Sequence, residues 1–152
     1  MDCPDLTPAH RNRVLCIGDS YRRLTGRALV PGGGDPIDTL WSAPLAIVAH
    51  GTEPDPVFFI GNRAALALFE MDFDAFTRLA SRFSAEPLLQ AERMRLLARV
   101  SRDGIIEDYA GVRISATGKR FHISNAAVWN LTDGAGTAVG QAAAFATWQY
   151  VS

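Results

Sequence analysis

The last third of the chain limits most strongly what it can fold into. Residues 105–115, 120–131 and 139–151 are three long runs with the pattern of β-strands. The short segments between them, 116–119 and 132–136, carry Gly118, Gly134 and Gly136, which is typical of hairpin turns. Three consecutive strands joined in this way predict an antiparallel meander.

The segments before this meander alternate between strand and helix patterns. Short apolar runs predict two buried strands, and capping residues followed by apolar periodicity predict three helices. The predicted strands are residues 45–50 and 57–61, and the predicted helices are residues 63–70, 72–79 and 84–103. Together with the meander, this order predicts an α+β fold with a five-stranded antiparallel sheet and helices on one face.

An extra N-terminal helix is predicted over residues 7–26, where Gly26 is suited to end it. The glycine-rich break at residues 30–36 follows. We therefore divide the chain into an N-terminal helix and cap (1–30) and a main domain (31–152). The helix carries one apolar stripe, formed by Val14, Ile17, Tyr21 and Leu24.

This stripe predicts that the N-terminal helix packs on the outer face of the sheet. One helix covers only part of a five-stranded sheet, and Val128 is an apolar residue expected on the same face. Since large apolar patches usually mark contacts, we expect a homodimer that involves the N-terminal helix. The alternative is a helix that seals its own sheet.

The overall charge argues against two classes of partner. Lys and Arg number 15 and Asp and Glu 16, a net charge of −1, so we expect neither nucleic acid nor an anionic membrane surface as a partner. No apolar run approaches the ~20 residues that span a bilayer. The first residues are acidic where a signal peptide is basic, and two cysteines suit a reducing compartment, so we expect a cytoplasmic protein.

A set of motifs extends over nearly the whole chain. They are residues 21–27 (YRRLTGR), 81–87 (SRFSAEP), 92–93 (ER), 108–115 (DYAGVRIS), 118–121 (GKRF), 128–131 (VWNL) and 140–143 (GQAA), with Asn62 after Asp55-Pro56. In this combination, residues 10–148 resemble the MEKHLA domain family. One departure is His50-Gly51-Thr52, where an acidic residue after the histidine is commoner.

The resemblance implies a PAS-like fold, whose order of elements is the one predicted above. Such domains occur as small bacterial proteins and at the end of plant homeodomain–leucine-zipper factors. The resemblance implies a sensory or regulatory domain rather than a catalyst, and we expect its core cavity to bind a small molecule. Two alternatives stay open: a small NTF2-like α+β enzyme with an Asp or His general base, and a pure protein-interaction module.

Candidate ligand-binding residues come first from the strand over residues 120–131. Strict alternation places Asn125 on one face with five apolar residues, which are Phe121, Ile123, Ala127, Trp129 and Leu131. An unpaired buried amide costs ~1–3 kcal/mol, so Asn125 needs either a protein partner or a ligand. Gln141 raises the same question, and Trp129 is either a core residue or a stacking platform for a ligand.

Arginines supply the remaining candidates. Arg93 falls inside the helical stripe of Leu89, Leu96, Leu97 and Val100, so its guanidinium either reaches water or meets Asp108 or a bound acid. Arg82 and Arg113 are candidates to join it, Arg113 having the alternative of a surface position. The ligand-binding set is therefore Asn62, Arg82, Arg93, Arg113, Asn125, Trp129 and Gln141.

The sequence leaves the cofactor unknown. A light-sensing flavin adduct needs a cysteine near residues 80–83, whereas Cys3 and Cys16 lie more than 60 residues away. A noncovalent flavin stays open. An axial histidine for haem is missing from residues 84–103, and no metal-ligand spacing occurs, so we expect no metal and no catalytic residue.

Overall fold

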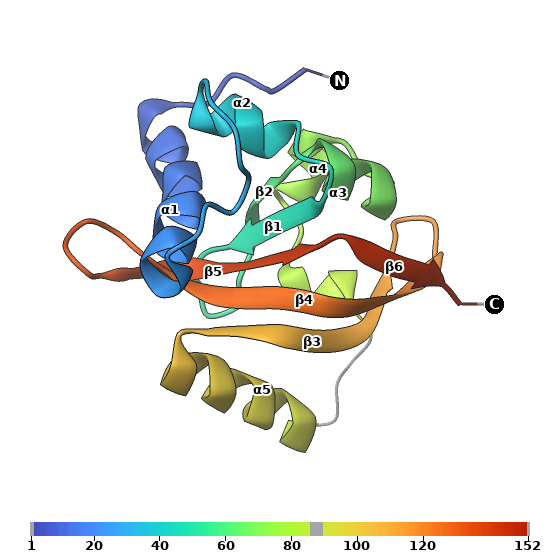
Figure 1. Ribbon diagram of the computed structural model, residues 1–152. Helices are drawn as coiled ribbons and strands as arrows, with labels where there is room; N and C mark the ends of the chain where they lie inside the picture. The colour runs from blue at the N-terminus through green and yellow to red at the C-terminus, as the bar shows by residue number, and fades with distance from the viewer. Residues whose placement is uncertain (1, 86–89, 152) are drawn as a thin grey trace.

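The computed structural model describes residues 2–85 and 90–151 (Figure 1). Its helices are α1 (Pro8–Thr25), α2 (Pro36–Trp41), α3 (Arg63–Phe69), α4 (Phe73–Phe76), the 3₁₀ helix η1 (Ser81–Ser84) and α5 (Gln90–Asp103). Its strands are β1 (Ala46–His50), β2 (Phe58–Gly61), β3 (Ile105–Ile114), β4 (Arg120–Thr132), β5 (Ala138–Phe145) and β6 (Thr147–Tyr150). The α+β order predicted from the sequence is confirmed.

The sheet is antiparallel, with the strand order β2-β1-β5-β4-β3 and with β6 also paired to β4. The meander of β3, β4 and β5 is confirmed. The third predicted strand of the meander, residues 139–151, is in fact two strands with Ala146 between them. Residues 121–124 of β4 pair with β6, whereas residues 127–132 pair with β5. The irregular backbone of β4 between these segments explains why the partner strand is also interrupted.

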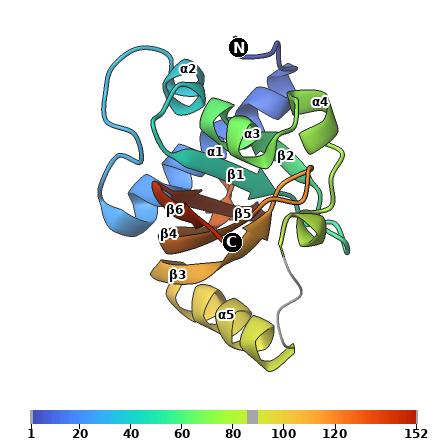
Figure 2. The ribbon, with the colours of Figure 1, turned by 90° about the vertical axis from the view of Figure 1, so that its right-hand side faces the viewer.

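The two faces of the sheet carry two separate cores. The inner face, as we call it, contacts α3, α4 and α5 through residues such as Phe69, Phe76 and Val100. The outer face contacts α1 and most of α2 through Val14 and Ile37. Figures 1 and 2 show α1 and α5 on opposite sides of the sheet. The predicted position of the N-terminal helix on the outer face is therefore confirmed.

Helix α1 is closed at both ends by local signals. The Thr7 side chain accepts a hydrogen bond from the His10 amide, and Gly26 adopts a left-handed conformation with φ of 74°. Val14 and Ile17 are buried against the sheet, whereas Leu24 is 41% exposed. The apolar stripe thus faces the sheet of its own chain for most of its length.

Val128 was predicted to lie on the outer face. It belongs instead to the core of the inner face. The reason is a backbone irregularity at Asn125, whose φ is 53°. Phe121 and Ile123 are buried on the inner face before this point, and after it Trp129 and Leu131 are buried on the outer face. The prediction of one continuous apolar face along β4 is therefore wrong.

The helix predicted from Ser84 has a different beginning. Ser84 ends the 3₁₀ helix η1, and α5 begins at Gln90. Of the predicted stripe, Leu89 lies outside the described residues, Val100 is buried and Leu97 is 47% exposed, so Leu97 is not part of the buried face of α5. No helix in the described parts of the chain combines the length and the hydropathy that crossing a bilayer requires.

Candidate functional site

Three polar side chains form a row across the inner face. Asn130 of β4 lies opposite Gln141 of β5, and Gln141 lies opposite His50 of β1. The Gln141 Nε2 donates to the Asn130 Oδ1 at 3.5 Å, and the Asn130 Nδ2 donates to the Val100 carbonyl oxygen at 3.1 Å. All three side chains of the row are half-buried. We call Asn130, Gln141 and His50 the amide–histidine row.

A row of small and aliphatic residues lies next to it. Val48, Ala143, Val128 and Ile106 are in register across β1, β5, β4 and β3. Ala143 belongs to the central strand of the sheet, yet it is only half-buried. If larger side chains packed over the Ala143 methyl group, that group would be fully buried. The inner face is therefore accessible at Ala143.

The other half of the inner face is filled by aromatic rings. Phe58 and Phe76 are stacked with their ring centroids 4.3 Å apart, and Phe69 meets Phe121 edge-on at 5.3 Å. Phe145 contacts Trp148 in the same way at 6.1 Å. This packed half forms the rigid support of the face. The part of the inner face that these rings leave open carries Ala143 and the amide–histidine row.

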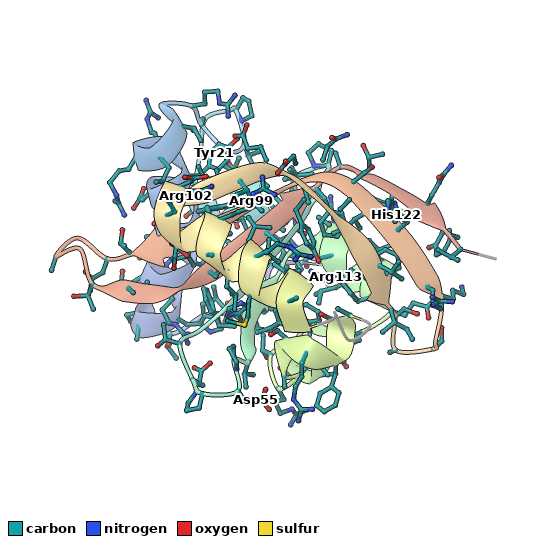
Figure 3. All side chains as sticks on the ribbon, turned by 90° about the horizontal axis from the view of Figure 1, so that it is seen from below. Tyr21, Asp55, Arg99, Arg102, Arg113 and His122 are labelled. Carbon is teal, nitrogen blue, oxygen red and sulfur yellow. The ribbon has the colours of Figure 1, made fainter. Side chains whose placement is uncertain are left out.

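Strand β3 contributes polar groups to the same face. Tyr109 lies opposite Ala126, and Arg113 lies opposite Phe121, both of which are buried in the inner core. Directly opposed residues of an antiparallel pair point to the same face, so Tyr109 and Arg113 are inner-face residues. Figure 3, which views the molecule from the side of α5, labels Arg113 on this side. The sequence analysis left open whether Arg113 lies in the site or on the surface. In the structure, its side chain is on the inner face and half-buried.

Asn62, another predicted ligand-binding residue, forms all the hydrogen bonds of its side chain with the backbone of the protein. Its side chain is fully buried, and its Oδ1 accepts from the amides of Ile47 and Ala65 at 3.0 and 3.1 Å. Its Nδ2 donates to the carbonyl oxygens of Leu40 and Leu45 at 3.0 and 2.9 Å. Asn62 caps α3 as predicted, and these four bonds leave its amide no group for a ligand.

Asn125 and Trp129 lie away from the accessible part of the inner face. Asn125 is exposed, because the irregular backbone of β4 turns its side chain out of the apolar row, so its predicted place in the core is wrong. Trp129 is fully buried on the outer face and donates its Nε1–H to the Ile17 carbonyl oxygen at 3.1 Å. Its ring meets Tyr21 of α1 edge-on, so Trp129 is a docking residue for α1.

The two remaining arginines do not extend the site. Arg82 is exposed, forms an ion pair with Asp55 at 3.1 Å and lies over the Phe83 ring. The side chain of Arg93 lies outside the described residues. Its predicted partner Asp108 forms an ion pair with Arg99 at 2.6 Å. Of the predicted set, the structure therefore brings Gln141 and Arg113 to the inner face.

Three inner-face residues were missed by the sequence analysis: Asn130, His50 and Tyr109. A signal for Asn130 was present, because the hairpin between β4 and β5 places residue 130 opposite residue 141 once its register is known. His50 then follows from its pairing with Gln141. No signal within β3 itself distinguished the face of Tyr109, because the register of β3 against β4 shifts on both sides of this residue.

A separate cavity lies on the outer side, between α1, the glycine-rich loop and α2. Its volume is about 230 Å³. Gly18 and mainly apolar side chains line it, and the exposed Asp19 and Arg22 lie at its border. It holds none of the polar groups of the inner face. The described residues contain no cluster of His, Cys, Asp or Glu with which to bind a metal ion.

The two cysteines do not belong to the strands that carry the amide–histidine row. Cys16 is on α1, and Cys3 precedes it. Burial raises the pKa of both thiols, which keeps them protonated and lowers their reactivity. Neither residue is part of the inner-face strands, although Cys3 packs against the cores of both faces.

Residues 11–150 match the family model of the MEKHLA domain. The chain belongs to the MEKHLA domain family. The match includes α1 as well as the sheet, and the division of the chain at residue 30 stays a prediction. No curated protein matches this MEKHLA domain.

Several solved structures share the fold of this MEKHLA domain. A light-oxygen-voltage (LOV) domain studied with a flavin analogue has a TM-score of 0.57 at 17% identity, covering 76% of this chain and 84% of that one. The LOV domain of Aureochrome1 has a TM-score of 0.54 at 19% identity, with 83% and 89% covered. A PAS domain from Colwellia psychrerythraea has a TM-score of 0.55 at 9% identity, with 74% and 90% covered. The predicted PAS-like fold is confirmed.

Proposed function

We propose that this MEKHLA domain is a sensory or regulatory domain that binds a small molecule on the inner face of its sheet, without catalysis. Its family and its PAS-like fold support a sensory or regulatory role. The similarity to PAS and LOV structures also favours this proposal over the NTF2-like enzyme considered from the sequence.

The observation that carries the proposal is the accessible centre of the sheet. Gln141 and Ala143 both lie on the inner face of the central strand β5, and both are only half-buried. Binding sites for small molecules are typically apolar surfaces with a few placed polar groups. Ala143 with its aliphatic neighbours provides the apolar surface, and the amide–histidine row provides the polar groups.

The row suits a ligand that both donates and accepts hydrogen bonds. The Gln141 amide donates weakly to Asn130 across 3.5 Å, and no described residue donates to its Oε1. The His50 Nδ1 lies 2.9 Å from the Gly51 carbonyl oxygen, so Nδ1 donates this hydrogen bond and leaves Nε2 for the ligand. A heterocycle with polar edges, a flavin included, fits these groups noncovalently.

His50 also gives a specific basis for the enzyme alternative. It is an imidazole in a row that otherwise consists of amides, and an imidazole nitrogen without a proton is able to act as a general base. Under our proposal His50 binds the ligand but transfers no proton. A His50→Gln variant retains the hydrogen-bonding capacity and is therefore expected to bind the ligand.

The homodimer through α1 and the cytoplasmic location stay predictions. The apolar area that suggested the dimer is covered by α1 of the same chain, apart from the end of the helix at Leu24. Any signal from a bound ligand leaves through a contact surface, and α1 lies with α2 on the face opposite the proposed site.

Native mass spectrometry after gentle purification tests the proposal. We expect the wild-type chain to carry an additional mass that is lost on denaturation. The Gln141→Leu variant should lose most of it, while Gln149→Leu on the exposed side of β6 retains it. A wild-type protein with only its bare mass would contradict the proposal and favour an interaction module. A ligand lost from a Gly18→Leu variant, which fills the outer cavity, would move the site to that cavity.

A further inference from the structure

The inner face of β3 carries a polar pair beside the proposed site. Tyr109, Gly111 and Arg113 lie opposite Ala126, Ile123 and Phe121, each of which is buried in the inner core. The three residues of β3 therefore share the inner face. The Arg113 guanidinium lies 5.4 Å from the centre of the Tyr109 ring.

The hydroxyl group of Tyr109 is buried without a partner. The residue is 8% exposed, and no described residue accepts or donates a hydrogen bond at its Oη. Such an unpaired buried group costs free energy, and native proteins rarely contain one without a ligand, a water molecule or a functional reason.

Gly111 determines where this hydroxyl lies. A Cβ atom at position 111 would meet the Tyr109 Oη at 2.7 Å and the ring carbon that carries it at 3.1 Å. The phenol therefore lies along β3 directly over Gly111, in the direction of Arg113. Any larger residue at position 111 would move the hydroxyl away from this place.

Arg113 lacks the ion pair that several other arginines of the chain form. Arg27, Arg82, Arg99 and Arg102 each form an ion pair with an acidic side chain. Arg113 is half-buried, and no carboxylate of the described residues lies within ion-pair distance of it. Even the acidic residues of its own strand, Glu107 and Asp108, are paired elsewhere. A half-buried guanidinium on a core face normally has an anionic partner.

We infer that Arg113 and Tyr109 together bind an anionic group, a carboxylate or a phosphate, of the small molecule that occupies the inner face. This inference rests on the proposed function. The guanidinium provides two parallel N–H donors for the anion, and the phenol provides one further donor. One bound anion would thus be the hydrogen-bond partner of both the Arg113 guanidinium and the Tyr109 hydroxyl.

The positions of the two polar groups also limit the shape of the ligand. Ile123, opposite the Gly111 over which the Tyr109 hydroxyl lies, and Asn130 are seven residues apart on β4, which corresponds to about 23 Å along a strand. Val128 lies between them on the same face. A molecule that reaches both ends is therefore elongated, with an acidic end at β3, an apolar middle and a polar end at Gln141.

Thermal denaturation in the presence of inorganic phosphate or acetate, at constant ionic strength, tests this inference. We expect a saturable rise in the Tm of the wild type. The apparent affinity should fall at least tenfold in Arg113→Gln and severalfold in Tyr109→Phe. The exposed, paired Arg82 provides the control variant Arg82→Gln, whose response should equal that of the wild type. An equal response in Arg113→Gln, or no saturable response in the wild type, would overturn the inference.

A second readout keeps the result independent of stability. The Nε–Hε resonance of Arg113, assigned by its loss in Arg113→Lys, should move in NMR spectra as phosphate is added. The Gln141→Leu variant should keep this response, because the amide–histidine row lies at the other end. If the molecule retained in native mass spectrometry is neutral, the inference of an anionic group is wrong, whereas the proposed function still holds. Tighter binding of phosphate than of acetate would favour a phosphate ester as the ligand.

Discussion

Gly140 of β5 lies so close to His50 of β1 that a Cβ atom at position 140 would overlap the His50 carbonyl oxygen. The φ of Gly140 is 156°, which side chains rarely allow. Gly140→Ala should therefore push β5 away from β1 and lower the free energy of unfolding by roughly 3 kcal/mol or more in urea denaturation. Gly134→Ala, in an open turn, is the control and should change it little. Similar values for both variants would contradict the close approach of the two strands.

Asn62 joins four backbone groups from three segments, and we expect it to be a stability residue. Asn62→Leu keeps most of the volume but leaves the amides of Ile47 and Ala65 and the carbonyl oxygen of Leu45 without the partner that Asn62 provides, while the Leu40 carbonyl oxygen still accepts from Ala43. Because each unsatisfied buried group costs about 1–3 kcal/mol, the variant should lose at least about 3 kcal/mol of stability. Asp72→Ala removes an exposed helix cap and should cost only about 1 kcal/mol in the same denaturation experiment. A loss in Asn62→Leu no larger than in Asp72→Ala would show that the amide network is dispensable.

Trp129 links β4 to α1, and its indole should be needed for the docking of this helix. Trp129→Phe removes the hydrogen bond to the Ile17 carbonyl oxygen and leaves a small void beside Tyr21. The expected loss is about 2–3 kcal/mol, with faster hydrogen exchange in α1. Trp148→Phe is the matched control, because Trp148 is only half-buried. Unchanged exchange rates in α1 would rule out this role for Trp129.

Glu70 predicts a dependence of stability on pH. Hydrogen bonds from Thr117 and Lys119 hold the pKa of Glu70 below its ordinary value of 4.5. A group with a lowered folded-state pKa contributes stability above its unfolded-state pKa and loses it as the pH falls through the folded-state pKa. The stability difference between the wild type and Glu70→Gln should thus be largest near neutral pH and vanish in acid. A difference that stays constant from pH 7 to pH 3 would contradict this assignment.

Glu70 also has a left-handed backbone, with φ of 59° at the end of α3. Glycine adopts this conformation without strain, so Glu70→Gly separates the two properties of the residue. This variant should lose the dependence on pH, as Glu70→Gln does, while relieving the backbone. Its stability in acid should consequently be no lower than that of Glu70→Gln.

Much of the fold followed from local chemistry in the sequence. The glycine-bearing turns between the last strands determine a meander, and Thr7, Gly26 and Asn62 mark helix ends that the structure confirms. The break at Ala146 and the end of η1 at Ser84 were not predictable in this way. Both depend on how distant strands pair, and the sequence pattern of one segment does not contain that information.

The candidate site was predicted less well, for one physical reason. Alternation assigns faces correctly only along a regular strand, and Asn125 interrupts this alternation in β4. Asn125 was therefore predicted in the core, although it is exposed. Val128 was predicted on the outer face, although it belongs to the inner core. Gln141 was assigned correctly because β5 is regular along its pairing with β1. Arg113 required the pairing of β3 with β4, which shifts twice.

The occupancy of the inner face in an Ala143→Leu variant tests the central claim most directly. The larger side chain would fill the accessible surface at the centre of the sheet, and its added apolar contacts should leave the Tm unchanged or higher. Native mass spectrometry should show a bound small molecule on the wild type and none on a folded Ala143→Leu protein. An equal fraction of ligand-bound protein in both would contradict a binding site on the inner face.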